Sequence, residues 1–406
     1  MKRGARRILL VHYTTPAVLG GVEEIMGAHA AGLRDAGADV TILAGRGSAR
    51  PRGVRTVIIP ELDSRNGEVV RQLAALARGH VPTGYPALVQ RIARAIRAHV
   101  QRADRVVVHN VMTMHLNLAF TEALMRVATE QPRRFVAWTH DLAWDDERYA
   151  AFRRDEEPWS LLHRVVPGVT YVTVSEERAR QLSELTGLAR EKIHVVPNGI
   201  DMRATLGLST HGARLAQRLD LYHADPLLLL PVRITRRKRI EIAIDAVAAL
   251  RRRGVPAVLV VTGAPGPHSS TNRGYQAELL ERAKGVEGVQ LLYALGIRAH
   301  YAMVADLYAL ADALVLPSET EGFGIPMLEA GLHHLPIVCT DLAVLRETGG
   351  DAPVYVPRDA DGEQVATAVM KALEAPSARL RSRARAHDWS YVMPQQVLPV
   401  ILGPGR

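Results

Sequence analysis

The sequence predicts an α/β protein with two doubly wound parallel sheets. Short apolar runs rich in β-branched residues alternate with longer amphipathic stretches, which is typical of strands and helices that alternate along a chain. This pattern occurs in two series, and a loosely patterned segment near residues 199–225 separates them. The length of 406 residues is also too great for one compact domain and suits two.

The first series predicts a parallel sheet covered on both faces. Its expected strands span residues 8–11, 40–43, 106–108, 135–138, 171–174 and 193–196. Residues 22–36 are predicted to form a helix, because their apolar side chains lie largely on one side and Gly37 closes the segment. Residues 62–87 are the least regular part of this half, with Asn66-Gly67 and Gly84 as turn signals, and predict a mobile loop.

The second series predicts a second sheet of the same kind. Its expected strands span residues 227–230, 258–261, 290–293, 314–316, 337–338 and 354–356. We therefore expect one domain over residues 1–200 and another over residues 201–385. In open α/β sheets, ligands bind beyond the carboxyl ends of the strands. Two such domains facing each other would form a cleft lined by the loops that follow strands.

The composition excludes several classes of protein. Cys339 is the only cysteine, so a disulfide framework is impossible and a reducing cytoplasm is the expected compartment. The N-terminal arginines precede an apolar run, residues 8–11, that is too short for a signal peptide. No apolar stretch is long enough to span a bilayer.

The formal net charge of +9 is compatible with nucleic acid, an anionic membrane surface or anionic small molecules as partners. The sequence has no arginine–aromatic platform, zinc-ligand pattern or recognition-helix signature, so we expect no nucleic acid partner. Arg91, Arg94 and Arg97 alternate with apolar residues at a helical period. This favours a solvated arginine face over a peripheral membrane contact. No pattern sets an oligomeric state.

Two loops that follow expected strands carry residues suited to phosphate groups. Gly20 and Gly21 open a helix, where glycines let the backbone approach an anion, although a simple tight turn is equally compatible. They do not form the G-x-G-x-x-G fingerprint of dinucleotide binding. Arg233 and Lys238 follow the strand expected at 227–230 and would hold a pyrophosphate, or would belong to a solvated basic loop.

The loop after the strand expected at 314–316 combines glycines with carboxylates. Gly322 and Gly324 would expose backbone N–H groups to an anion or a sugar hydroxyl. Glu329 falls in the following helix, and its carboxylate suits a vicinal diol such as that of ribose. Glu321, before the turn, would reach a second polyol. The alternative is a helix N-terminus that carries acidic residues because its dipole favours them.

Taken together, these motifs resemble a known family. The segment SETEGFGIPMLEA, with Glu321 and Glu329 as its E-x7-E pattern, resembles the donor-binding motif of retaining GT-B glycosyltransferases of family 4. LGGVEE resembles the family's first glycine loop, VPNGID its domain junction, and Arg233 with Lys238 its R-x4-K pair. HDWSYV resembles the C-terminal segment that crosses back to the first domain, here residues 386–406.

The resemblance implies roles for the matching residues. Glu329 would bind the donor ribose, Arg233 and Lys238 would neutralise the leaving diphosphate, and Glu321 would hold donor sugar hydroxyls. His140 matches a family histidine beside the anomeric carbon, so the catalytic set would be His140, Arg233, Lys238 and Glu321. No metal or other cofactor would be required. The residues assigned to the donor are Gly20, Gly21, Arg233, Lys238, Leu295, Glu321, Gly322, Phe323, Gly324 and Glu329.

The acceptor is expected on the first domain. Its candidate residues are Asn110, His115, Asn117 and Asp141, which would bind a small polar acceptor or, equally, cap helices and satisfy backbone groups. The basic composition is compatible with a small anionic acceptor. A membrane lipid acceptor stays open as an alternative.

The sequence therefore predicts a retaining enzyme that moves a hexose from a donor of the UDP-glucose or GDP-mannose type to a hydroxyl acceptor. The alternative on the same architecture is a nucleotide-sugar epimerase, against which the E-x7-E and R-x4-K patterns argue. A nicotinamide-dependent oxidoreductase would need the missing glycine fingerprint. A non-catalytic protein would bind nucleotide sugars without turnover.

Overall fold

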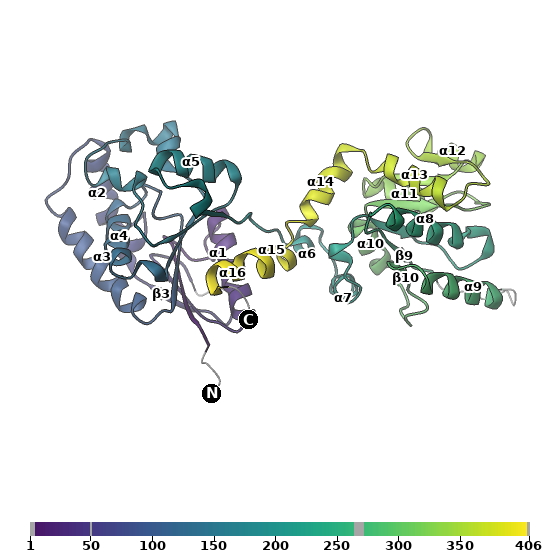
Figure 1. Cartoon of the computed structure of the whole chain (residues 1–406), viewed down its shortest axis with the longest axis horizontal. Helices are drawn as coiled ribbons and strands as arrows, with labels where there is room; N and C mark the ends of the chain where they lie inside the picture. Colours follow the sequence, from purple (N-terminus) through teal and green to yellow (C-terminus); the bar gives the residue numbers. More distant parts are fainter. Residues whose placement is uncertain (1–4, 49–50, 264–271, 404–406) are drawn as a thin grey trace. The chain divides into compact units, whose positions relative to one another are not determined.

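The computed structural model describes residues 5–48, 51–263 and 272–403, and it divides into two compact units (Figure 1). Unit 1 comprises Met1–Gly199 together with Trp389–Arg406, and unit 2 comprises Ile200–Asp388. The end of the chain therefore packs with the first unit, although unit 2 separates them in the sequence. Each unit has its own parallel sheet and its own core.

Unit 1 has a seven-stranded parallel sheet in the order β3-β2-β1-β4-β5-β6-β7. Side chains along β1 alternate between its faces, because Leu9 and Val11 join one buried cluster while Ile8 and Leu10 join the other. The strands are β1 (Arg7–Val11), β2 (Asp39–Ala44), β3 (Arg55–Ile58), β4 (Arg105–His109), β5 (Phe135–Thr139), β6 (Thr170–Thr173) and β7 (Ile193–Val195).

Helices cover both faces of this sheet. Leu88 and Phe120 pack on the face of Leu9, whereas Met26 and the C-terminal Val397 pack on the face of Ile8. The C-terminal segment thus completes the core of unit 1. The α-helices of unit 1 are α1 (Gly21–Asp35), α2 (Gly67–Ala77), α3 (Tyr85–Val100), α4 (Leu118–Glu130) and α5 (Glu176–Thr186). The C-terminal segment adds the short helices α15 (Trp389–Val392) and α16 (Leu398–Leu402), with the π-helical turn η9 (Met393–Val397) between them.

Residues 62–87 contain a helix, so the prediction of a mobile loop there was wrong. Asn66 begins α2, because its Oδ1 accepts hydrogen bonds from the backbone N–H groups of Glu68 and Val69. Val69 and Leu76, seven residues apart and on one side of the helix, are buried in the core. Strand β3 was not predicted, because it pairs only with β2 at the edge of the sheet and buries none of its residues fully.

Unit 2 has a six-stranded parallel sheet in the order β10-β9-β8-β11-β12-β13. Its strands are β8 (Leu227–Leu230), β9 (Val258–Val261), β10 (Val289–Leu291), β11 (Ala313–Leu316), β12 (Ile337–Thr340) and β13 (Val354–Val356). Strand β10 ends at Leu291, two residues earlier than expected, because the N–H groups of Ala294 and Leu295 turn back to the Leu291 carbonyl. The unbroken apolar run of β8 is buried on both faces, as central parallel strands require.

The helices of unit 2 join the strands and pack on both sides of the sheet around one buried cluster. They are α6 (Met202–Thr205), α7 (Thr210–Arg218), α8 (Ile240–Arg252), α9 (Asn272–Lys284), α10 (Tyr301–Leu310), α11 (Ile325–Leu332), α12 (Ala343–Gly349), α13 (Gly362–Ala372) and α14 (Pro376–Arg385). Short 3₁₀ turns occur in both units. Within the described ranges, no helix combines the length and hydropathy needed to cross a membrane.

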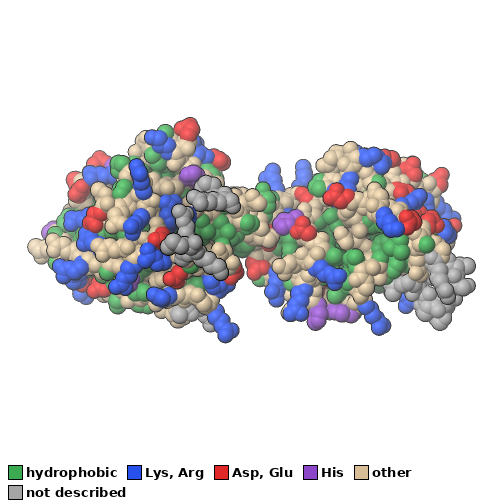
Figure 2. Space-filling model, turned by 60° about the horizontal axis from the view of Figure 1, so that its bottom comes forward, with side chains coloured by type: hydrophobic (Ala, Val, Ile, Leu, Met, Phe, Trp, Pro, Cys, Tyr) green, Lys and Arg blue, Asp and Glu red, His purple; other side chains and the backbone are tan. Residues whose placement is uncertain are grey.

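On the face drawn in Figure 2, the basic residues are spread out rather than collected in one patch. Lys and Arg side chains lie scattered there among acidic ones. In α3, the apolar residues Leu88, Ile92 and Ile96 are buried, as expected. Arg91 and Arg97 on its outer side pair with Glu68 and Glu130 of neighbouring helices.

Candidate functional site

The candidate donor site of unit 2 lies where the strand order of its sheet reverses. Strands β8 and β11 are neighbours, and the chain leaves them towards opposite edges of the sheet. Ligands bind at such a switch point, because the loops that follow the two strands diverge and leave a crevice. Arg233 and Lys238 lie on the loop after β8, and Glu321 to Gly324 lie on the loop after β11.

The switch point brings Lys238 and Glu321 into direct contact. Lys238 Nζ donates to Glu321 Oε1, and the Ser318 hydroxyl donates to the same oxygen at 2.7 Å. The Lys238 and Glu321 side chains are only 10% and 8% exposed. Because the pair is buried, removing either member leaves an uncompensated charge. The sequence assigned the two residues to different parts of the donor, whereas the structure joins them.

The glycine loop after β11 presents backbone amides at the start of α11. Among the described residues, the N–H groups of Gly322, Phe323 and Gly324 donate to no protein acceptor. Gly324 adopts a left-handed conformation with φ of 92°, and a Cβ there would lie 2.7 Å from Leu345 Cδ2. Only glycine fits this position without strain. The free amides and the positive end of the helix dipole together suit an anion.

Glu329 is oriented by a residue that the sequence did not single out. Its Oε2 accepts a hydrogen bond from the Tyr308 hydroxyl at 2.7 Å. Tyr308 comes from α10, and its ring stacks on His333 with 5.6 Å between the ring centroids. Burial raises the pKa of Tyr308, so the phenol stays protonated and donates. One carboxylate oxygen of Glu329 is thereby fixed and the other remains for a ligand.

Two further donor candidates lie on exposed loops. Arg233 is exposed and forms no ion pair with any residue that the structure describes. Its backbone packs against Gly263, which follows β9, because a Cβ on Gly263 would lie 2.6 Å from Arg233 Cα. Leu295 is 40% exposed on the turn after β10. The structure therefore places Arg233 at the switch point and Leu295 after β10, two strands further along the sheet.

The glycine loop of unit 1 lies at the corresponding switch point, between β1 and β4. Glu23 of α1 accepts a hydrogen bond from Thr14, and its Oε1 lies 3.7 Å from His12 Nε2. Burial by itself raises the pKa of Glu23, but the hydrogen bonds from His12 and Thr14 outweigh it and lower the pKa to about 2. A Cβ on Gly20 would lie 2.1 Å from Glu23 Oε2, whereas Gly21 faces open space. A larger residue at position 20 would therefore displace the Glu23 carboxylate from its contacts with His12 and Thr14.

His140 directly follows β5 and lies beside other buried histidines. Its Nε2 lies 3.4 Å from His109 Nδ1, and the His109 ring is 5.2 Å from that of His29. Burial lowers the pKa of His140 to about 4. Burial and the nearby His140 lower the pKa of His29 to about 3, and burial holds that of His109 well below 6.5. These three imidazoles are therefore neutral near pH 7, so His140 can donate or accept a hydrogen bond but carries no charge.

Because of these histidines, the stability of unit 1 is expected to depend on pH. In the unfolded chain they bind protons below a pKa of 6.5, whereas in the folded protein the pKa of His140 is lowered to about 4 and that of His29 to about 3, and the pKa of His109 lies well below 6.5. Unfolding therefore takes up protons in this window, and the free energy of unfolding falls as the pH drops from 6.5 towards 4, by up to about 1.4 kcal/mol per pH unit for each histidine. Urea titrations between pH 7.5 and 5.0 test this.

Tryptophan fluorescence is a suitable signal for these titrations, because all four tryptophans of the chain lie in unit 1. Trp138 and Trp389 both contact the His29 ring edge-on. The His29→Gln variant should show a shallower pH dependence than the wild type. A stability that is independent of pH between 6.5 and 5.0 would contradict the neutral histidine cluster.

Asn110 fixes the polypeptide around His140. It has a left-handed backbone with φ of 55°, which asparagine tolerates better than most residues. Its Oδ1 accepts from the backbone N–H groups of His140 at 3.0 Å and Asp141 at 2.8 Å, and its Nδ2 donates to Asp141 Oδ2 at 3.1 Å. Asn110 thus positions its neighbours, while the Asp141 side chain remains 52% exposed.

The other two acceptor candidates, Asn117 and His115, make contacts within unit 1. Asn117 caps α4 through a hydrogen bond from Phe120 N, and its Nδ2 donates to the Glu61 carbonyl at 2.9 Å. The His115 ring lies 4.2 Å from the ring of Tyr149 and 4.4 Å from that of Phe152. Burial lowers the pKa of His115 to about 4. For Asn117, the capping interpretation is the one observed.

Two family models match this chain. The model "Glycosyltransferase Family 4" matches residues 19–204, and "Glycosyl transferases group 1" matches residues 225–375. The chain belongs to the glycosyltransferases of family 4. The first range lies in unit 1 apart from its last five residues and the second lies in unit 2, so this glycosyltransferase carries both Rossmann-like halves of the GT-B fold.

Three curated relatives show the same relationship. The mannosylglucosylglycerate synthase of Petrotoga mobilis is 25% identical over 266 residues, which are 60% of this chain and 61% of that protein. The glycogen synthase of Mycobacterium tuberculosis is 28% identical over 94% of this chain and 89% of its own. The D-inositol 3-phosphate glycosyltransferase of Geodermatophilus obscurus is 32% identical over 54% of this chain and 49% of its own. The match to the first relative thus spans about three-fifths of its length.

Three residues of the glycosyltransferase site escaped sequence reasoning. Tyr308 lies mid-helix among apolar residues, so nothing local distinguishes it from a core tyrosine. Ser318 stands inside the recognised motif but carries no spacing signal. Gly263 lies two residues after the end of β9, and a glycine just beyond a strand could have suggested a close backbone approach.

Proposed function

We propose that this glycosyltransferase moves a hexose from a nucleoside diphosphate sugar to a hydroxyl acceptor with retention of anomeric configuration. The observation that carries the proposal is the contact of Lys238 with Glu321 at the switch point of unit 2, beside the unpaired amides of Gly322 to Gly324. A diphosphate needs cations and N–H donors, and sugar hydroxyls need carboxylates. The same loops offer both.

In this proposal unit 2 binds the donor. Arg233 and Lys238 hold the diphosphate, with the arginine as a fork and the lysine as a point charge. Glu321 and the free amides bind the hydroxyls of the transferred sugar. Glu329, which Tyr308 holds by one oxygen, offers its second oxygen to the ribose diol. Leu295 lies where the nucleobase would contact the protein.

The proposed reaction assigns a role to each of these groups. The acceptor oxygen bonds to the anomeric carbon on the face from which the diphosphate departs, the carbon–phosphate oxygen bond breaks, and the departing phosphate takes the acceptor's proton. Negative charge grows on the diphosphate, so Arg233 and Lys238 stabilise the transition state more than the bound donor. Because these two side chains supply the positive charge, we propose that no resident metal or cofactor is needed. His140, which is neutral, would donate a hydrogen bond to the sugar.

The ribose assignment is tested by Glu329→Ala. The change removes a partly buried diol contact worth about 1–3 kcal/mol, so we expect the affinity for the cognate nucleotide to fall roughly 5- to 150-fold. Binding is measured by calorimetry after a thermal-shift panel of UDP, GDP, ADP and TDP and their sugar conjugates has identified the nucleotide. The matched control is Glu347→Ala, an exposed glutamate on α12. Equal nucleotide affinities in the two variants would show that Glu329 does not bind the ribose.

Product analysis tests the reaction itself. We expect NMR of the glycoside to show the anomeric configuration of the donor, and turnover to persist in excess EDTA. Inverted product or loss of turnover with EDTA would overturn the corresponding part of the proposal. An epimerised donor formed without any acceptor would instead indicate a nucleotide-sugar epimerase.

A further inference from the structure

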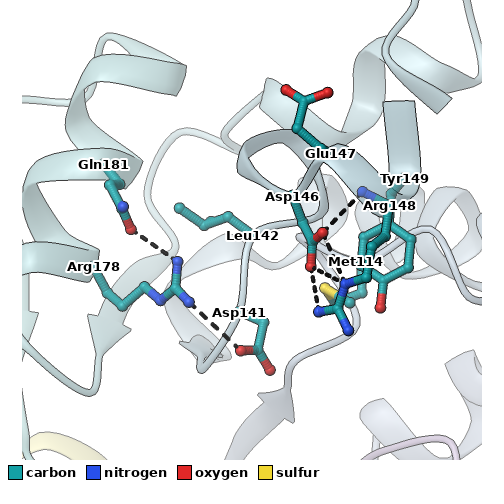
Figure 3. Close-up of a pocket in the computed structure, with 9 residues that line it drawn as sticks. All are labelled: Met114, Asp141, Leu142, Asp146, Glu147, Arg148, Tyr149, Arg178 and Gln181. Carbon is teal, nitrogen blue, oxygen red and sulfur yellow. Dashed lines mark hydrogen bonds and ion pairs between the residues drawn. The ribbon is translucent and has the colours of Figure 1, made fainter. Parts of the chain in front are cut away.

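A pocket of about 410 Å³ lies in unit 1 beside His140, and the family motifs do not account for it. It lies beyond the carboxyl end of β5, between the loop that follows this strand, the 3₁₀ turn Glu147–Phe152 and α5 (Figure 3). Its size is within the range of small-molecule sites, and ligands of α/β sheets bind at this end of the strands.

The central feature of this pocket is the pair Asp141 and Arg178. The two side chains point towards one another (Figure 3), and the distance from Arg178 Nη2 to Asp141 Oδ1 is 3.8 Å. This is too long for a hydrogen bond. A ligand hydroxyl near both groups would accept from the guanidinium and donate to the carboxylate. The gap therefore has the chemistry of a hydroxyl-binding position.

Both members of the pair are held in place by neighbouring side chains. Asn110 donates to Asp141 Oδ2, and Gln181 accepts from Arg178 Nη1 at 2.9 Å. Ser175 caps α5 by accepting from the backbone N–H of Arg178. Because their positions are fixed before a ligand arrives, binding costs little side-chain entropy.

The charges around the pair disfavour an anion. Arg148 is the other cation of the lining. Its Nε and Nη2 both donate to the Asp146 carboxylate, so it is not free for a ligand. Of the three carboxylates in the lining, Asp146 is paired with Arg148 and Glu147 with Arg153, so Asp141 is the carboxylate that faces Arg178. A phosphate or carboxylate at Arg178 would be repelled by the Asp141 carboxylate, whereas an uncharged hydroxyl would not.

We propose that this pocket binds the acceptor and that the acceptor presents uncharged neighbouring hydroxyls, as a sugar or polyol does, to Asp141 and Arg178. The inference rests on the proposed transfer reaction and narrows its acceptor. It departs from the anionic acceptor that the net charge of the whole chain suggested. Met114, Leu142 and Tyr149 supply the apolar surface against which a sugar ring packs.

The test uses the full chain and the donor selected by the nucleotide panel. Transfer is measured to glucose and glycerol as uncharged probes, and to glucose 6-phosphate and glycerate as anionic ones. We expect transfer to an uncharged probe, with its KM raised at least tenfold by Arg178→Gln and by Asp141→Asn. The matched control Arg180→Gln, two residues along α5 and paired with Glu177 and Glu184, should leave the KM unchanged.

Nucleotide binding and donor hydrolysis separate the two levels of the proposal. Both should be detectable in the wild type and unchanged in the control variant Arg180→Gln. If wild type binds and hydrolyses donors but transfers only to the anionic probes, or if Arg178→Gln and Asp141→Asn leave the KM for every probe unchanged, the acceptor inference is wrong. If wild type neither binds nucleotides nor hydrolyses donors, the proposed transfer reaction is wrong as well as the acceptor inference.

Discussion

Replacing Lys238 by methionine is expected to lower turnover at saturating donor by two to three orders of magnitude, the usual effect of removing one preorganised group that stabilises developing negative charge. The affinity for the donor should fall much less, because the charge on the leaving diphosphate is greatest in the transition state. Single-turnover rates at saturating donor test this. An unaltered rate would show that Lys238 does not stabilise the leaving diphosphate in the transition state.

The same variant should also destabilise unit 2. Glu321 would be left as a buried, unpaired carboxylate, which costs about 3–5 kcal/mol. The double variant Lys238→Met with Glu321→Gln removes both charges, keeps the Ser318 hydrogen bond, and should recover most of the stability but none of the turnover. Thermal unfolding followed by circular dichroism supplies the comparison. A double variant no more stable than the single one would show that the pair makes no net contribution.

Replacing Gly324 by alanine is expected to destabilise unit 2 by about 1–3 kcal/mol and to abolish donor binding at ordinary concentrations. The cost has two sources, the left-handed backbone with φ of 92° and the close approach to the fully buried Leu345. Restoring an allowed backbone would turn the amides of Gly322 and Phe323 away from their present direction. Thermal unfolding and nucleotide calorimetry measure the two effects.

Gly322→Ala is the matched control for Gly324→Ala. It lies in the same loop, has no positive φ, and has nothing within 4 Å of the added Cβ. Its unfolding temperature should match that of the wild type. Adding Leu345→Ala to the Gly324→Ala variant would relieve the clash but not the backbone strain. If Gly324→Ala and Gly322→Ala were equally stable, the conformational role of Gly324 would be wrong.

The strands that carry the site were predictable because they are buried on both faces. Leu227–Leu230 and Ala313–Leu316 are continuous apolar runs with no polar interruption, and local sequence is enough to identify such segments. The residues after them were predicted as site residues from motif spacing. Strand β3 and helix α2 were missed or misassigned, since an edge strand has little apolar signal and the Asn66 cap looked like a turn.

The roles of polar residues were less predictable, because they depend on partners distant in the sequence. Asn110 and Asn117 have the same local signal, a polar residue after a strand. The first organises the loop of His140, and the second caps α4 and holds the Glu61 carbonyl. Tyr308 is 21 residues from Glu329, and only the packing of α10 beside α11 shows that it orients that carboxylate.

By itself, the sequence determined the two parallel sheets, their approximate strands, and the glycosyltransferase motifs that follow them, since periodicity and spacing are local properties of the chain. Only the tertiary structure decided which of these groups meet. Strand order places the loops after β8 and β11 side by side, so Lys238 becomes the partner of Glu321 although 83 residues separate them. Likewise, Asp141 and Arg178 face each other only because β5 and β6 are neighbours in the sheet. Contacts of this kind depend on sheet order, which no local pattern encodes.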